Sequence, residues 1–165
     1  MLFRSDPCYP CNRHFVAAAG GLARLIPTTA AQRFQLDADS VRAHWNARTR
    51  GVLLASPSNP TGTSIEPSEL RNIVQTVRER GGVTLVDEIY LCLSYESRFG
   101  NTALALGEDV ISINSFSKYF GMTGWHLGWL VLPPDLVAPV EKLAQNLYIC
   151  ASAVAQHAAL ACFEP

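Results

Sequence analysis

The chain has 165 residues, of which 48% are hydrophobic and 16% are charged, with 13 Lys and Arg residues against 14 Asp and Glu residues. That length suits about one globular domain. The near-neutral charge, without a basic run, does not favour binding to nucleic acid or to an anionic membrane surface, and no apolar run approaches the roughly 18 residues of a membrane span.

The predicted elements alternate between strands and helices along the chain. In order, the pattern predicts a helix over 12–19, strands over 23–26 and 51–56, a helix over 67–80, strands over 83–87, 109–114 and 127–132, and a helix over 134–147. Pro67 suits the first turn of the helix over 67–80, and Gly81 suits the position just beyond its end. Pro139 lies inside the helix over 134–147, which weakens the prediction of that helix. This alternation indicates an α/β fold, a mostly parallel sheet flanked by helices.

The five cysteines are odd in number and irregularly spaced, which does not favour a disulfide framework. Cys8 and Cys11 have the CxxC spacing that redox and zinc sites use, but no second pair follows them. We therefore expect no metal site and a reduced, cytoplasmic protein.

Chemically useful side chains follow three of the predicted strands. Ligands bind beyond the carboxyl ends of the strands in open α/β sheets, so we expect these side chains to share one edge of the sheet. They are Asn59 after the first of these strands, Asp87 and Tyr90 at the end of the second, and Ser115, Ser117 and Lys118 after the third.

Lys118 is the most informative of these residues. It follows an apolar strand and is flanked by hydroxyls, aromatic rings and glycines. A partly desolvated lysine loses its proton more easily and can form a Schiff base with an aldehyde. The fold is expected to place this amine where it acts as a nucleophile.

The other groups suit the same chemistry, although each has an ordinary structural explanation. Asp87 beside a protonated ring nitrogen makes that ring an electron sink, but it also suits a helix cap. The segment Asn59-Pro60-Thr61-Gly62 is typical of a turn, and Tyr90 of a core aromatic residue. Hydroxyls such as that of Ser117 suit a phosphate and are also common in turns. Tyr9 either packs on neighbouring prolines or stacks on a planar cofactor.

Four segments in this order and spacing resemble the fold-type-I pyridoxal-phosphate enzymes, in particular the class I/II aminotransferases. They are Asp6-Pro7-Cys8-Tyr9-Pro10, Asn59-Pro60-Thr61-Gly62, Val86-Asp87-Glu88-Ile89-Tyr90, and Ser115-Phe116-Ser117-Lys118 followed by Gly124-Trp125-His126-Leu127-Gly128-Trp129. The resemblance implies pyridoxal 5'-phosphate as cofactor and transamination between an amino acid and a 2-oxo acid.

The resemblance also implies a role for each site residue. Lys118 would be the Schiff-base lysine and the proton shuttle. Asp87 would pair with the pyridine nitrogen, and Tyr9 would stack on the ring. Asn59 and Tyr90 would form hydrogen bonds with the 3'-oxygen of the cofactor. Ser115 and Ser117 would bind its phosphate.

His126 departs from the family pattern, which has a phosphate-binding arginine at this place. Histidine is shorter than arginine and titrates near pH 6.5, so we expect weaker and pH-dependent cofactor binding. The alternative is that His126 faces away from the cofactor.

The resemblance assigns residues 1–165 to part of the large cofactor-binding domain, without the family's N-terminal segment and C-terminal small domain. We therefore expect a fragment or truncated product that is inactive alone, and a homodimer in the full-length form. Arg4, Arg13 and Arg98 are expected to be solvated charges rather than ligands of the substrate carboxylate.

Two further functions remain open on the sequence. One is a pyridoxal-phosphate lyase that cleaves a C–S bond, because it would share every residue named above. The other is a non-catalytic remnant or interaction domain. A nucleotide-binding Rossmann domain is not favoured, because no G-x-G-x-x-G segment follows a strand.

Overall fold

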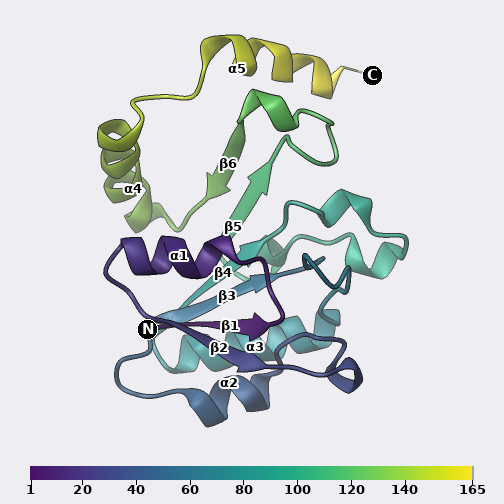
Figure 1. The fold of residues 1–165 in the computed structure, drawn as a ribbon, viewed down its shortest axis with the longest axis vertical. Helices are drawn as coiled ribbons and strands as arrows, with labels where there is room; N and C mark the ends of the chain where they lie inside the picture. The colour runs from purple at the N-terminus through teal and green to yellow at the C-terminus, as the bar shows by residue number, and fades with distance from the viewer. Residues whose placement is uncertain (165) are drawn as a thin grey trace.

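The computed structural model describes residues 1–164 as one six-stranded sheet with helices on both faces (Figure 1). The strands are β1 (Leu2–Asp6), β2 (Ala23–Pro27), β3 (Gly51–Ala55), β4 (Val83–Asp87), β5 (Val110–Ser115) and β6 (Gly128–Val131). The helices are α1 (Cys11–Ala18), α2 (Ala38–His44), α3 (Pro67–Glu79), α4 (Pro134–Leu147) and α5 (Ala153–Leu160).

The sheet has the order β2-β1-β3-β4-β5-β6, and every neighbouring pair is parallel except the antiparallel pair β5–β6. Ala55 pairs with Asp87 in the register, and Asp87 pairs with Ile113. The carboxyl ends of β3, β4 and β5 therefore lie at one edge of the sheet. The predicted α/β fold and its mostly parallel sheet are confirmed.

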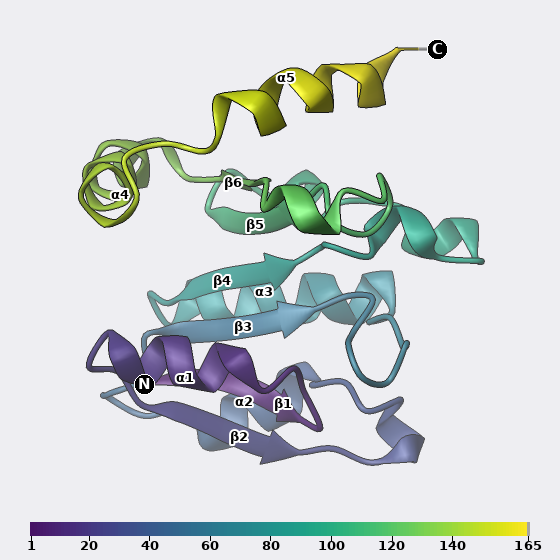
Figure 2. The same cartoon turned by 45° about the horizontal axis from the view of Figure 1, so that its top comes forward.

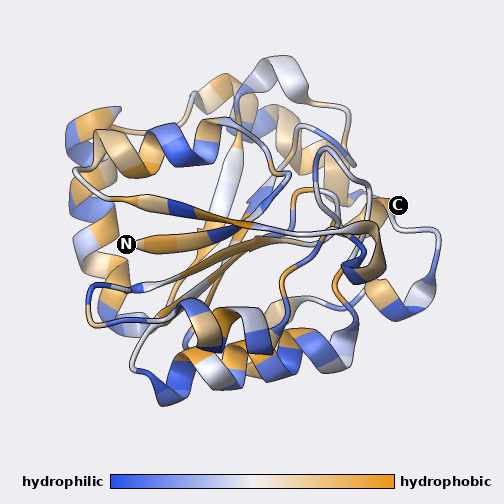
Figure 3. Ribbon diagram, turned by 60° about the horizontal axis from the view of Figure 1, so that its bottom comes forward, coloured by the Kyte–Doolittle hydropathy of each residue, from blue (hydrophilic) through white to orange (hydrophobic). Residues whose placement is uncertain are grey.

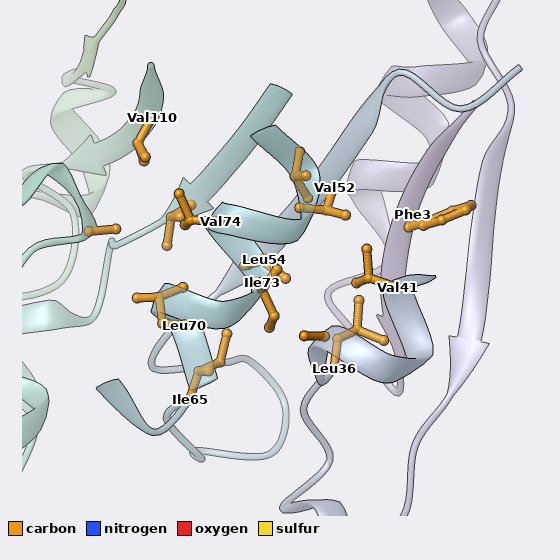
Figure 4. Close-up of a cluster of buried hydrophobic side chains, with 14 of the residues drawn as sticks. Phe3, Leu36, Val41, Val52, Leu54, Ile65, Leu70, Ile73, Val74 and Val110 are labelled. Atoms are coloured by element: carbon orange, nitrogen blue, oxygen red, sulfur yellow. The ribbon is translucent and has the colours of Figure 1, made fainter. Parts of the chain in front are cut away.

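The main core lies between the sheet and the helices α2 and α3, which cover one face while α1 lies on the other (Figure 2). All five residues of β3 are buried, as a central parallel strand requires. Figure 4 shows Val52 and Leu54 of β3 near Ile73 and Val74 of α3. Complete burial of one such side chain contributes about 1.5–3 kcal/mol.

Helix α3 begins and ends where the sequence predicts. Pro67 occupies its first turn, and Gly81 adopts a φ of +65° just beyond the helix, a conformation that glycine tolerates without strain. Polar and apolar residues alternate along α2 and α3 in Figure 3, as expected of helices that cover a core on one side. Asp37 begins α2, where its carboxylate accepts a hydrogen bond from the backbone N–H of Ser40 at 2.7 Å.

A second apolar cluster lies at the other end of the sheet. Phe116, Met122 and Leu127 pack there against Ala155 and Ala159 of α5. This cluster holds the segment that carries Lys118 against α5. Among residues 1–164, no helix combines the length and the apolar character needed to cross a bilayer.

Three elements were not predicted, namely β1, α2 and α5. β1 carries a charged residue at its centre, which hid the strand pattern, and α2 has only seven residues. Helix α4 runs through Pro139, although proline removes one backbone donor from a helix.

Candidate active site

The predicted residues gather around one cavity of about 250 Å³ at the carboxyl ends of β3, β4 and β5. Six of the eight predicted site residues line it: Tyr9, Asn59, Asp87, Tyr90, Ser117 and Lys118. Its other lining residues are Arg4, Ala55, Pro57 and Ile89. Side chains more than 100 positions apart in the chain therefore meet because parallel strands end at a common edge.

Asp87 lies at the last position of β4, where the strand ends and its side chain enters the cavity. Its Oδ1 accepts a hydrogen bond from the backbone N–H of Ile89 at 3.2 Å. Burial raises the pKa of Asp87 above its usual value, and the Ile89 hydrogen bond and the Arg4 charge oppose that rise. A cation that entered the cavity would stabilise the ionised carboxylate.

Glu88, the next residue, points away from the cavity and fixes the end of β4. Its buried carboxylate accepts hydrogen bonds from the Ser112 hydroxyl at 2.5 Å, the Ala103 N–H at 2.6 Å and the Thr102 hydroxyl at 2.8 Å. Charge-assisted hydrogen bonds of this kind are stronger than neutral ones. They tie β4 to β5 and so hold Asp87 in place.

Asn59 lies in a tight turn after β3. The Gly62 N–H donates to the Ser58 carbonyl at 2.7 Å, and Gly62 has a φ of +67°, which favours glycine. The Gln35 amide donates to the Thr63 carbonyl at 2.7 Å and thereby anchors the turn. Asn59 Nδ2 lies 3.5 Å from the Tyr90 hydroxyl, at the outer limit of a hydrogen bond.

Lys118 lies in a closed turn after β5. The Gly121 N–H donates to the Lys118 carbonyl at 3.1 Å, and the Thr123 hydroxyl donates to the Ser117 carbonyl at 2.7 Å. The Lys118 side chain is exposed at the mouth of the cavity rather than desolvated as the sequence predicted. The turn therefore fixes the backbone of Lys118, while its side chain is exposed to solvent.

Ser115 and Ser117 share one hydrogen-bonded unit, although only Ser117 lines the cavity. The Ser115 hydroxyl donates to Ser117 Oγ at 2.9 Å, and the Ser117 N–H donates to Ser115 Oγ at 3.0 Å. Ser115 therefore stands behind Ser117 and orients it.

His126 does not line this cavity, and its side chain is exposed. Its backbone has a φ of 51°, in the left-handed region, directly before β6. A role of His126 toward a phosphate remains a prediction.

Arg4 was expected to be a solvated charge, and this prediction is wrong. Its side chain is only 3% exposed and lines the cavity from β1. Phe3, its neighbour, is buried in the main core, and strand alternation turns Arg4 to the opposite face. Recognition of β1 from the sequence would have predicted this placement. By contrast, Arg98 is exposed and binds Glu66 and Glu96.

All five cysteines are free. Within residues 1–164, no three His, Cys, Asp or Glu side chains group in a way that would hold a metal ion. Cys8 and Cys11 flank Tyr9 at the start of α1, beside the cavity.

Residues 2–165 match the sequence model of a protein family described as aminotransferase class I and II. The chain belongs to this family. It is 38% identical over 162 residues to a valine–pyruvate aminotransferase of Mycobacterium tuberculosis, an alignment that covers 98% of this chain and 42% of the relative. Members of the family are known to use pyridoxal phosphate and to act on amino acids and 2-oxo acids.

Solved aminotransferase structures share the same fold. A crystal structure of an aminotransferase from Mycobacterium tuberculosis superimposes with a TM-score of 0.92 at 38% identity and covers 99% of this chain and 42% of that one. The aspartate aminotransferase of Thermotoga maritima gives a TM-score of 0.91 at 29% identity, over 96% of this chain and 43% of that one. The chain thus spans about two fifths of the length of these relatives.

The cavity has a donor set that fits pyridoxal phosphate. A desolvated carboxyl group, Asp87, suits a cationic ring nitrogen, and the amine of Lys118 suits an aldehyde. The Ser117 hydroxyl and the polar groups of Asn59 and Tyr90 complement oxygen atoms. In this member of the family, one cavity therefore combines acid, amine and hydroxyl groups.

Proposed function

We propose that this chain binds pyridoxal 5'-phosphate and takes part in transamination between an amino acid and a 2-oxo acid. One observation supports this above all: the amine of Lys118, the carboxyl group of Asp87 and the hydroxyl of Ser117 line a single cavity. The membership of the aminotransferase family supports it independently.

The cofactor, when bound, supplies an aldehyde that an amine can attack and a ring that draws electrons from the substrate α-carbon. Lys118 would hold the cofactor and then, as a free amine, carry a proton from the substrate α-carbon. Its exposed position at the cavity mouth lets it reach both an incoming substrate and the cavity interior.

The other residues would bind and orient. Asp87 would place a negative charge against the ring nitrogen, in a site where burial strengthens that interaction. Asn59 and Tyr90 would donate to the ring oxygen, and Tyr9 would lie against the ring. Ser117, oriented by Ser115, would donate to the phosphate.

Within the full-length protein we further propose a homodimer that works in the cytoplasm. The apolar side chains Leu147, Tyr148 and Ile149 are all more than half exposed at the end of α4, as is usual for a surface that a neighbour covers. The free cysteines suit a reducing compartment.

The chain contains two lysines, Lys118 and Lys142, which makes the attachment site simple to test. Incubation with pyridoxal phosphate, borohydride reduction and peptide mass analysis should place the label on Lys118. The variant Lys118→Ala should lose the label, whereas Lys142→Ala, on the exposed helix α4, should keep it. A label on Lys142 or on the amino terminus alone would overturn the assignment.

The reaction class needs a product assay on the protein that carries these residues. Transamination gives a new amino acid and a new 2-oxo acid. Release of ammonia and a thiol would instead indicate a lyase, and a label at Lys118 without any product would indicate a non-catalytic remnant.

A further inference from the structure

Arg4 is a buried cation that the proposed mechanism does not use. Its side chain is 3% exposed, and among residues 1–164 it forms no ion pair within 4 Å. Nη1 and Nη2 donate to the Asn12 side-chain oxygen at 2.7 and 3.1 Å, with the amide oriented by this network, while Nε is buried without a partner. Buried charges are rarely left uncompensated, so this guanidinium calls for an anion nearby.

The sheet register places Arg4 on the same face of the sheet as one anion, Asp87. Phe3 pairs with Val52, and Val52 pairs with Thr84, so these residues share the face of the main core. Side chains alternate between the two faces along a strand. Arg4 is one position from Phe3 and Asp87 is three positions from Thr84, so both lie on the other face. Both side chains line the same cavity, one from β1 and one from β4.

We propose that Arg4 is a positioning residue that keeps the Asp87 carboxyl group ionised within the cavity. The effect of Arg4 on Asp87 does not depend on the proposed function. Only its use rests on that function, in which the ionised Asp87 pairs with a cationic ring nitrogen. The electrostatics agree, because the Arg4 charge lowers the pKa of Asp87 against the effect of burial. Asn12, from α1, would in turn hold the guanidinium in place.

Other groups around Asp87 do not replace this charge. Contact with the Cys11 side chain raises the pKa of the Tyr9 phenol, so that phenol is neutral in the acid range where a carboxyl group titrates. Lys118 is exposed to solvent, which screens its charge, and the Glu88 charge raises the pKa of Asp87. The charged and titratable groups that share the cavity with Asp87 are Arg4, Tyr9, Tyr90 and Lys118, and Glu88 is the next residue in the chain.

The direct test measures the titration of the Asp87 carboxyl carbon by NMR, in the chain without added cofactor. The variant Arg4→Met should raise the Asp87 pKa by about 1, because a neighbouring arginine lowers an aspartate pKa by about 1–3. Arg24→Met is the matched control: Arg24 lies on β2, exposed, and pairs with Phe3, so it occupies the far face of the sheet. That control should leave the Asp87 titration unchanged.

An unchanged Asp87 titration in Arg4→Met, or an equal change in Arg24→Met, would overturn the proposal. If Arg4→Met does not fold, Arg4→Lys and Arg4→Gln replace it, because both are polar and only the lysine retains the charge. Asp87 should then titrate higher in the glutamine variant than in the lysine variant. Equal titration would again overturn the proposal.

Cofactor affinity gives a second readout that a purely structural role would not produce. The readout is the dissociation constant of pyridoxal phosphate for Arg4→Met divided by that for the wild type. Because the cofactor titrates in the same way in both measurements, its own pH dependence cancels in this ratio. We expect this ratio to be higher at pH 5 than at pH 8, by up to about tenfold, because a higher Asp87 pKa leaves the variant with less carboxylate in acid. A ratio that is raised equally at both pH values would contradict the proposal. If the wild type binds no cofactor, the proposed function fails, and the carboxyl titration still decides the role of Arg4.

Discussion

The two faces of the sheet follow different rules. On the face covered by α2 and α3, an apolar core is sealed from water and includes Phe3, Val52 and Ile73. On the other face, at the carboxyl ends of the strands, Arg4 and Asp87 are charged and line an open cavity. Adjacent residues in β1 therefore belong to the core and to the site, respectively.

This difference shows how the chain separates stability from chemistry. Apolar burial on the core face stabilises the strands without requiring specific partners. The strand ends can then carry a desolvated carboxyl group that destabilises the fold in its ionised form. The pKa of Asp87 is higher in the folded state than in the unfolded state. Protonated Asp87 therefore favours folding at low pH, and this contribution to the free energy of unfolding is lost as the pH rises through the folded-state pKa.

The largest expected effect is on the core face. Ile73→Ala removes a fully buried side chain from α3 and should lower the free energy of unfolding by about 2–5 kcal/mol. Urea denaturation measures the loss. Arg71→Ala, on the exposed side of the same helix, is the control and should change stability by less than about 0.5 kcal/mol. A loss below about 1 kcal/mol for Ile73→Ala would show that the core face is not tightly packed.

A smaller effect is expected at His126, which lies outside the cavity. His126→Arg should tighten pyridoxal phosphate binding by about tenfold or more, because one charge-assisted contact contributes about 1.5–3 kcal/mol. Imidazole titrates near neutral pH and guanidinium does not, so the variant should also bind with less pH dependence. Titrations of both proteins and of His126→Asn, which tolerates the left-handed backbone, would measure this. Equal dissociation constants would mean that His126 faces away from the cofactor.

The smallest effect is expected at an exposed ion pair that links α3 to the residue before β5. Arg78 donates to both carboxylate oxygens of Asp109, at 2.6 and 2.8 Å, and these bonds lower the pKa of Asp109. Asp109→Asn should cost about 0.2–1 kcal/mol at pH 7, since both side chains are substantially exposed.

The sign of this effect follows from the lowered pKa. The stabilisation is present above the unfolded pKa and is lost as pH falls through the folded one. Thermal melts of wild type and Asp109→Asn should therefore converge as the pH is lowered from 6 toward 3. A difference that grows in acid would contradict the assignment.

Periodicity and turn chemistry were enough to predict most of the fold. The apolar run of β3, the stripe of α3 and the glycines after it all depend on interactions between near neighbours in the chain. The motif residues were enough to predict six side chains that line one cavity, whereas Ser115 and His126, which were also predicted, do not line it. The exposure of Lys118 could not be predicted, because it depends on what packs around the turn after β5.

The sequence alone determined the α/β fold, the common edge of β3, β4 and β5, and the choice of Lys118, Asp87 and Asn59, because strand periodicity and motif order are local properties of the chain. Only the tertiary structure decided that Arg4 is buried and shares the cavity with Asp87, and that His126 lies outside this cavity. The physical reason is that a charged side chain in a short strand has no preferred environment until register and alternation assign it a face.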